Sequence, residues 1–268
     1  MLIVNCDNWL GLMIGNSRLH WAWFAGATLQ AAWDTDHLPA LVVEQLIQGW
    51  QAGEWKTELF PDSQINPIQI SNPTPIPLKL ASVVPHQTEL WQTYPNTHLI
   101  TLDQLPLQGL YPTLGIDRAL AVLGAGENFG FPVLVIDGGT ALTFTGVDAQ
   151  KRLVGGAILP GLRLQIQSLT DRTAALPKIE LYSEMPQRWA LNTVEAIQSG
   201  VSYTVLAGVK DFIESWWQEF PDSKIAITGG DRALLLAYLQ AKFPHIADQV
   251  IADPHLIFWG IQFLTINN

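Results

Sequence analysis

The stretch VLVIDGGTALTFTGVDAQKRLVGGAILPGL, residues 133–162, decides the fold that we expect for this chain. Residues 133–136 are a short apolar run rich in β-branched side chains, which is typical of a strand buried on both faces. Asp137, Gly138, Gly139 and Thr140 then connect this run to a second apolar run at residues 141–147. The pattern predicts a strand, a tight turn and a second strand.

That turn has two interpretations. Its backbone N–H groups and the Thr140 hydroxyl can face a phosphate, while the Asp137 carboxylate can hold a cation. Alternatively, the segment is an ordinary β-hairpin in which aspartate and glycine only form the turn. The other segments of the chain decide between these two interpretations.

The same pattern occurs near the start of the chain, at residues 11–24, where GLMIGNSRLHWAWF predicts a strand, a turn and a strand. The turn is Gly15-Asn16-Ser17, and Leu19, Trp21 and Trp23 alternate with other residues after it. Gly15 and Gly139 lie about half a chain apart. The sequence therefore predicts two halves of related design.

Strand and helix signals alternate along the rest of the chain, which predicts an α/β fold of mixed sheets with two lobes around a cleft. Helices are expected at residues 38–50, 115–124, 160–175, 192–217 and 254–264, and strands at 78–84, 97–102 and 225–228. Asp231 is expected to cap the helix that follows Gly229-Gly230. The proline-rich residues 61–77 read as a surface excursion with little regular structure.

Composition narrows the function classes. The chain has 268 residues, 48% of them hydrophobic, and a formal charge of −10 with no cluster of lysine and arginine. This balance argues against a nucleic acid or an anionic membrane as partner, but it permits a small phosphorylated ligand. One cysteine, Cys6, excludes an internal disulfide, and no secretory signal or membrane span is recognised, so we expect a cytoplasmic protein.

Two common nucleotide-binding motifs are absent from the sequence. Gly124-Ala125-Gly126 resembles the start of a dinucleotide-binding turn, but it follows an expected helix and position 129 is Phe where a third glycine is required. The chain also has no G-x-x-x-x-G-K-[ST] loop. Any nucleotide must therefore be held by another kind of turn.

Several segments together resemble one family. They are ASVVP (81–85), GIDRALA (115–121), IDGGTALTF (136–144), GGAILPGL (155–162), RTAALP (172–177), NTVEAIQSG (192–200) and TGG (228–230). With the turn at Gly15-Asn16-Ser17, they are similar to the superfamily of acetate kinases, sugar kinases, Hsp70 and actin, in which two hairpins grip the phosphates of ATP. Within that superfamily the chain resembles the type III pantothenate kinases, in the family's order over nearly the whole chain.

The resemblance implies an actin-like ATPase architecture, also called ribonuclease H-like, with two related lobes of mixed β-sheet. The N-terminal lobe would span residues 1–114 and carry the first phosphate turn. The C-terminal lobe would span residues 115–268 and carry the second phosphate turn and dimer-forming helices. The implied activity is ATP-dependent phosphorylation of pantothenate to 4′-phosphopantothenate, the first step of coenzyme A biosynthesis.

The resemblance also implies site residues, carried over position by position. Asp117 matches the catalytic base, and Asp137 the ligand of a potassium or ammonium ion. Magnesium and ATP complete the implied cofactors, and the active site is completed across a homodimer. The substrate-binding residues are Gly115, Ile116, Asp117, Arg118 and Thr193, and the ATP-binding residues are Met13, Ile14, Gly15, Asn16, Ser17, Arg18, Leu19, His20 and Thr140.

Physical chemistry supports the role of Asp117. Phosphoryl transfer asks mostly for alignment and charge neutralisation, so one carboxylate near the substrate hydroxyl can serve as the base. A helix N-terminus and the neighbouring Arg118 both favour the ionised carboxylate. The alternative is that Asp117 only caps the first turn of a helix and Arg118 is a solvated surface charge.

Position 13 departs from the family motif D-x-G-N-[TS], because Met13 replaces the aspartate. In the superfamily that carboxylate lies close to the magnesium ion and the phosphates, so Met13 removes a magnesium partner. Magnesium is then held through water and ATP near Asp137, or the affinity for the nucleotide is weaker, or the protein is no longer a kinase. We favour the first of these.

Other functions are open at this level. One is a nucleotide-binding regulatory protein on the same fold, which Met13 favours, and another is a kinase for a different small alcohol or acid. The 115–118 and 192–200 segments count against the second, because they are the family's substrate-side motifs. Tyr111 is a further candidate for substrate contact, Arg172 is expected to be structural, and His20 is expected to be a cross-strand or core histidine.

Overall fold

The structure is a computed structural model that describes residues 8–52, 75–171 and 179–267. The chain divides into two compact units. The first comprises Met1–Leu105, Gly115–Asp117 and Ile261–Asn268, and the second comprises Pro106–Leu114 and Arg118–Gly260. Cys6, Arg172 and most of residues 61–77 lie outside the described residues.

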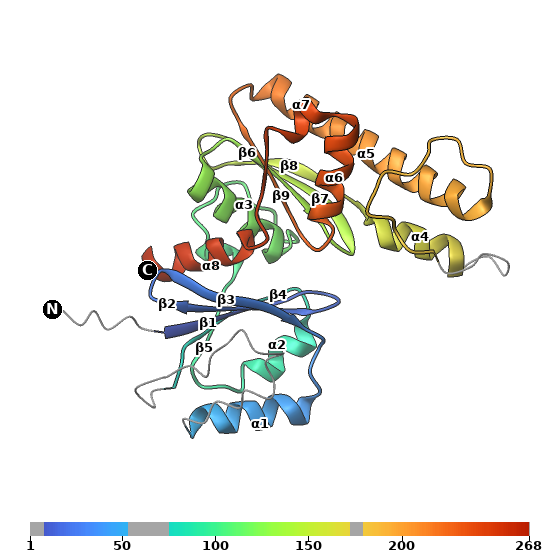
Figure 1. Cartoon of the computed structure of the whole chain (residues 1–268). Helices are drawn as coiled ribbons and strands as arrows, with labels where there is room; N and C mark the ends of the chain where they lie inside the picture. The colour runs from blue at the N-terminus through green and yellow to red at the C-terminus, as the bar shows by residue number, and fades with distance from the viewer. Residues whose placement is uncertain (1–7, 53–74, 172–178, 268) are drawn as a thin grey trace. The chain divides into compact units, whose positions relative to one another are not determined.

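The first unit contains a five-stranded sheet in the order β3-β2-β1-β4-β5. Its strands are β1 (Asn8–Ile14), β2 (Leu19–Ala25), β3 (Thr28–Thr35), β4 (Leu78–Ser82) and β5 (Thr97–Leu99). Helices α1 (Ala40–Gln51) and α2 (Pro85–Trp91) cover one face of this sheet (Figure 1), and the short 3-10 helix η2 spans Leu102–Gln104. Within this unit, Gln262 near the end of the chain donates a hydrogen bond to the Ala27 carbonyl between β2 and β3.

The second unit contains a five-stranded sheet in the order β10-β9-β6-β7-β8. Its strands are β6 (Val133–Gly138), β7 (Ala141–Val147), β8 (Leu153–Pro160), β9 (Lys224–Thr228) and β10 (Val250–Ala252). The remaining helices are α3 (Ile116–Phe129), α4 (Leu162–Asp171), α5 (Thr193–Glu219), α6 (Arg232–Lys242), α7 (Pro244–Ala247) and α8 (Leu256–Asn267).

The two sheets share one topology. In the first, β1 pairs antiparallel with β2 and parallel with β4, and in the second β6 pairs antiparallel with β7 and parallel with β9. The β1–β2 turn therefore corresponds to the β6–β7 turn. This equivalence confirms the predicted α/β fold with two related mixed sheets.

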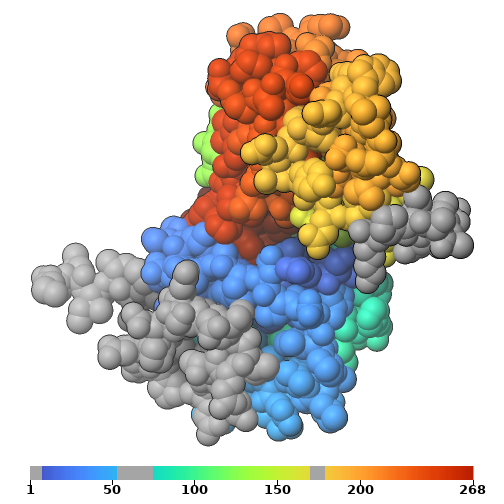
Figure 2. Space-filling model, turned by 45° about the vertical axis from the view of Figure 1, so that its right-hand side comes forward, coloured from blue at the N-terminus to red at the C-terminus, as the bar shows by residue number. Residues whose placement is uncertain are grey.

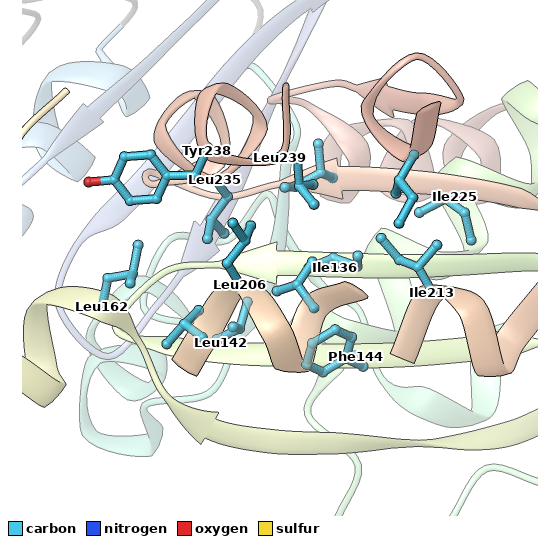
Figure 3. Close-up of a cluster of buried hydrophobic side chains, with 14 of the residues drawn as sticks. Ile136, Leu142, Phe144, Leu162, Leu206, Ile213, Ile225, Leu235, Tyr238 and Leu239 are labelled. Carbon is cyan, nitrogen blue, oxygen red and sulfur yellow. The ribbon is translucent and has the colours of Figure 1, made fainter. Parts of the chain in front are cut away.

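Each unit has its own hydrophobic core. In the first, Trp21, Trp50, Trp91 and Tyr94 pack with Leu12, Ile14 and Leu19, which explains several of the chain's many tryptophans. In the second, Ile136 of β6 and Phe144 of β7 lie beside Leu206 and Ile213 of α5 (Figure 3). Residues 133–136 are buried throughout, as the apolar run predicted.

Helix α3 is longer than the sequence predicted. We expected it to end near Gly124, but it continues to Phe129 and contains Gly124 and Gly126. A Cβ on Gly124 would stand 2.1 Å from the Leu256 carbonyl oxygen, and one on Gly126 would stand 2.1 Å from the Phe131 ring. The glycines are therefore required for close packing within the second unit and do not end the helix.

Asp231 also differs from its expected role. It is the residue before α6, but its side chain makes no capping hydrogen bond. Arg163 instead donates from Nε to Asp231 Oδ1 at 3.0 Å.

None of the described helices is long and apolar enough to cross a membrane.

Candidate active site

The turn between β6 and β7 is the best-defined part of the site. β6 ends at Gly138 and β7 begins at Ala141, so Gly139 and Thr140 form the connection. Gly139 donates its N–H to the Ala141 carbonyl at 3.0 Å. Asp137 is half-buried and Thr140 is exposed, so a ligand in solvent can reach the Thr140 side chain.

The turn after β9 packs directly on Asp137. Gly229 has a φ of +86°, and a Cβ built there would lie 2.3 Å from Asp137 Oδ1 and 2.5 Å from the Gly138 carbonyl oxygen. The Asp231 N–H also donates to Gly138 O at 2.8 Å. The segments 136–144 and 228–230, which are far apart in the sequence, therefore meet in one structure.

A third glycine, Gly161, also packs against this turn. A Cβ on Gly161 would stand 2.0 Å from the Gly139 carbonyl oxygen, and its N–H donates to Thr140 O at 2.9 Å. Gly161 was not a predicted site residue, whereas Gly229 was expected only as part of the phosphate-facing turn at residues 228–230. The signal was present in the Gly-rich segments 155–162 and 228–230, but sequence alone did not show which glycine contacts the turn.

The turn between β1 and β2 lies in the first unit. Gly15 donates its N–H to the Arg18 carbonyl at 2.9 Å, and the His37 ring donates from Nε2 to the Gly15 carbonyl at 2.8 Å. Asn16, Ser17 and Arg18 are exposed. Three residues of the expected ATP-binding stretch are instead buried, namely Met13, Ile14 and Leu19, so any ligand contact from them would come from their backbone.

His20 is a cross-strand histidine, one of the two roles expected from the sequence. Its Nδ1 lies 2.7 Å from Asp34 Oδ1, and a Cβ on Gly15 would lie 3.4 Å from its Nε2. The imidazole therefore lies between a carboxylate and the turn. Neither Asp34 nor His37 was a predicted site residue, because their pairing with β2 and the turn is not visible in a local pattern.

The start of α3 positions Asp117 and Arg118. Asp117 is in the first turn and half-buried. Arg118 is 7% exposed, so it is not the solvated surface charge of the alternative interpretation. Its guanidinium donates to Thr145 Oγ1 at 3.0 Å, to the Phe144 carbonyl at 2.9 Å and to the Tyr111 hydroxyl at 3.0 Å.

Arg118 is thus fixed on β7 through two non-local acceptors, and it also orients Tyr111. Gly156 makes room for it, because a Cβ at position 156 would lie 2.4 Å from Arg118 Nη2. Since the guanidinium fork is rigid, fixing it also fixes the first turn of α3 against β7. Because Asp117 is the residue before Arg118 in this turn, its backbone position is fixed as well.

Thr193 is the first residue of the long helix α5. Asn192 precedes it and caps the helix, because its Oδ1 accepts the Glu195 N–H at 3.0 Å. Thr193 is exposed and lines a groove of about 490 Å³ between α4 and α5. Gln165, Leu169, Ala196, Ile197, Gly200, Val201 and Thr204 complete the lining.

Among residues 8–52, 75–171 and 179–267, no group of three or more His, Cys, Asp or Glu side chains is arranged to hold a metal ion. A cation site at Asp137 would therefore combine its carboxylate with other oxygen atoms. The Gly138 carbonyl oxygen and Asp137 Oδ1 both approach the point that a side chain on Gly229 would fill. Carboxylate and carbonyl oxygens are the ligands that a hard cation prefers.

Two relatives of known family are similar to this chain over nearly its whole length. A relative from Nostoc sp., named type III pantothenate kinase, is 56% identical and covers 96% of this chain and 94% of its own. A relative of the same name from Synechocystis sp. is 48% identical, and the match covers 94% of this chain and 88% of the relative.

Two solved structures share the fold at low identity. A Campylobacter jejuni chain described as a Baf family transcriptional activator has a TM-score of 0.62 and 20% identity, covering 97% of this chain and 98% of its own. Component A of the Acidaminococcus fermentans (R)-2-hydroxyglutaryl-CoA dehydratase has a TM-score of 0.51 and 10% identity, covering 97% and 96%.

A family profile described as type III pantothenate kinase matches residues 9–215, which is more than half of the sequence. Together with relatives of 56% and 48% identity over nearly the full length, this match establishes the family. The chain belongs to the type III pantothenate kinases.

Proposed function

We propose that this protein transfers the γ-phosphoryl group of ATP to the 4′-hydroxyl of pantothenate. The product is 4′-phosphopantothenate, and the reaction is the first step of coenzyme A biosynthesis. The observation that carries this function is the match to type III pantothenate kinases over residues 9–215. The close packing of Asp137 and Gly138 against Gly229 supports it, because it forms a glycine-lined turn suited to a phosphate.

Asp117 is the proposed base. Its carboxylate would accept the proton of the substrate hydroxyl as the bond to phosphorus forms, which is the one proton transfer that this reaction needs. Gly115, Ile116 and Arg118 are the proposed neighbours of pantothenate. The buried guanidinium of Arg118, held on Thr145 and Phe144, supports a preformed first turn of α3.

The nucleotide is proposed to bind at the turns that follow β1 and β6. At the first, the exposed Asn16, Ser17 and Arg18 offer side chains and the turn offers backbone groups. At the second, the exposed Thr140 offers a hydroxyl. Phosphoryl transfer gains most from such fixed donors, since they stabilise charge on the transferring group without reorganising.

Asp137 is the proposed ligand of a potassium or ammonium ion. The nearness of the Asp137 carboxylate to the Gly138 carbonyl supports this role, because both are oxygen ligands of the kind that a hard cation prefers. Magnesium would arrive with ATP, which holds it between phosphate oxygens. When bound, these cations supply positive charge that offsets the phosphate charge.

The protein is proposed to act as a homodimer that pairs through the face formed by α4, α5 and residues 182–191, here named the α4–α5 face. Three large apolar side chains are exposed on this face: Trp189 is 85% exposed, Leu191 is 100% exposed, and Tyr182 is also exposed. In Figure 2, α4 (yellow) and α5 (orange) form part of the surface of this unit. Exposed apolar groups beside an open groove are typical of a surface that a second copy covers.

Thr193 connects this face to the substrate. It lines the groove between α4 and α5 and follows Leu191 by two positions. A pantothenate contact from Thr193 would therefore lie next to the second copy, as the family pattern implies. The expected cytoplasmic location stays a prediction, and it is supported by a sequence with a single cysteine.

A nucleotide-binding regulator is the second candidate, because Met13 replaces the motif aspartate. Calorimetry separates the two functions. A kinase binds both ATP and pantothenate, whereas a regulator of this kind binds ATP without pantothenate.

A coupled assay of ADP release tests the proposed function. Purified protein with ATP, Mg²⁺ and K⁺ should release ADP only when pantothenate is added. Replacing pantothenate with glucose, glycerol or acetate tests other acceptors. ADP release that needs one of these instead of pantothenate would contradict the proposal.

A further inference from the structure

Three side chains form a row across the first sheet. Met13 of β1 is directly opposite His20 of β2, and His20 is directly opposite Asp34 of β3. Leu19 and Trp21, the neighbours of His20 in the chain, belong to the hydrophobic core. Because side chains alternate along a strand, Met13, His20 and Asp34 share the opposite face.

One nitrogen of the His20 imidazole pairs with a carboxylate, and the other faces the β1–β2 turn. Its Nδ1 lies 2.7 Å from Asp34 Oδ1, whereas its Nε2 lies beside Gly15, 3.4 Å from the position of a Cβ on that glycine. The side chains of His20 and Asp34 are 39% and 49% exposed. A ligand at the β1–β2 turn can therefore reach Nε2.

The backbone groups of Gly15 already have partners. Its N–H donates to the Arg18 carbonyl, and its carbonyl accepts from His37. These bonds fix the turn on two sides. They leave His20 Nε2, and not Gly15, as the donor that faces a ligand at this position of the turn.

Hydrogen-bond chemistry assigns the protons on the ring. An aspartate accepts only, so Nδ1 carries the hydrogen that is shared with Asp34. The oxygens of a bound triphosphate accept hydrogen bonds, so a bond between one of them and His20 requires a hydrogen on Nε2 as well. Nε2 then carries a hydrogen and can donate a charge-assisted bond to a phosphate oxygen.

We propose that the Asp34–His20 pair supplies a cationic hydrogen-bond donor to a phosphate of the nucleotide at the β1–β2 turn. His20 is the phosphate-binding residue and Asp34 its positioning residue. The inference rests on the proposed function, since that function brings ATP to this turn.

Met13 fits this role. Directly opposed side chains on antiparallel strands have Cβ atoms about 5 Å apart, so an aspartate at position 13 would pair with His20 and neutralise it. Methionine has no charge and is buried, with 1% exposure. An uncharged side chain at position 13 is therefore compatible with a cationic His20 on the neighbouring strand.

Three variants test the role of charge. His20→Gln keeps a hydrogen-bond donor and removes the cation, His20→Lys keeps a cation, and Asp34→Asn keeps the shape of the positioning residue. We expect His20→Gln to raise the KM for ATP roughly tenfold or more, the size of one charged hydrogen bond. The KM for pantothenate should not change, and His20→Lys should stay within about threefold of the wild type, because a lysine is still a phosphate-binding point charge.

Asp34→Asn separates positioning from a merely structural role. Alone, it should raise the KM for ATP in the same direction as His20→Gln. Combined with His20→Lys, it should cause no further loss, because a lysine does not need Asp34 to orient it. His98→Gln, on β5 of the same sheet, is the matched control and should leave nucleotide binding unchanged.

Calorimetry with a non-hydrolysable ATP analogue, with and without Mg²⁺, completes the test. His20→Gln should weaken binding under both conditions, since the proposed partner is the phosphate itself. Weakening only with Mg²⁺ would overturn the inference, because the imidazole would then act on water bound to the metal. Unchanged binding by a folded His20→Gln protein would also overturn it. A wild type that binds the analogue but does not phosphorylate pantothenate would refute the proposed function and leave this inference testable.

Discussion

Asp137 and Gly229 are in such close contact that Gly229 has no room for a side chain. A Cβ at position 229 would stand 2.3 Å from Asp137 Oδ1, and the φ of +86° is strained for any residue that has one. This relationship joins the β6–β7 turn to the turn after β9. The β6–β7 turn, which is the candidate site for a cation and a phosphate, therefore depends on a glycine that lies 92 positions after Asp137 (229 − 137) in the sequence.

Gly229→Ala should distort this turn. A non-glycine residue at positive φ costs about 1–3 kcal/mol, and the clash with Asp137 adds to it. We expect a lower Tm and a much lower kcat. Gly230→Ala is the matched control, because a Cβ there meets nothing within 4 Å. Equal activity of the two variants would show that the contact with Asp137 does not matter.

Asp137→Ala should remove most of the activity and its dependence on potassium. The carboxylate is the proposed cation ligand, and an alanine offers no oxygen in its place. Rates should be measured across a K⁺ titration, with Asp211→Asn on the exposed side of α5 as the control. A variant that keeps both the rate and the potassium response would assign Asp137 a structural role only.

Asp117→Asn should lower kcat by on the order of 100-fold or more, the usual contribution of a general base. ATP binding should change little, because the variant keeps the size of the side chain. Steady-state kinetics and a nucleotide titration measure the two effects. An unchanged kcat would exclude Asp117 as the base.

Arg118→Lys should destabilise the second unit. The guanidinium reaches Thr145, Phe144 and Tyr111 at once, whereas one ammonium group cannot satisfy acceptors in all three directions. Buried acceptors left without a donor cost about 1–3 kcal/mol. Denaturant unfolding checks this, with Arg163→Lys as the control, because the Arg163 side chain is 70% exposed and has one recorded acceptor, Asp231, which a lysine can still pair with.

Trp189→Ser combined with Leu191→Ser should weaken the proposed homodimer. Both side chains are exposed on the α4–α5 face, so the change should not disturb the fold. Sedimentation velocity should show dimers for the wild type and monomers for the variant. Leu41→Ser on α1 removes an exposed leucine, 71% accessible, from the other unit and should have no effect. Dimers that persist in the double variant would place the interface elsewhere.

Sequence patterns predicted the parts of the fold that depend on local signals. The buried run at residues 133–136 and the turns at Gly15 and Gly139 gave the two hairpins that begin the sheets. The end of α3 was predicted wrongly because Gly124 and Gly126 look like helix terminators. Both positions need glycine because they pack closely against Leu256 and Phe131, and no local sequence pattern shows these contacts.

The site shows the same division. The motif residues Asp117, Asp137 and Thr140 could be selected by resemblance to a family. Arg118 could not be distinguished from a surface charge, since its acceptors on β7 lie 26 and 27 positions away. Asp34 was not selected either, because its pairing with His20 depends on the register of β2 and β3.

Phosphorus NMR of the reaction product tests the central claim most directly. The purified protein, ATP, Mg²⁺, K⁺ and pantothenate would be incubated, and the spectrum followed as ATP is consumed. We predict a new phosphomonoester resonance coupled to the 4′-methylene protons of pantothenate, growing in step with ADP. A spectrum in which ATP is stable, or in which ADP appears only with inorganic phosphate, would contradict the assignment of this protein as a pantothenate kinase.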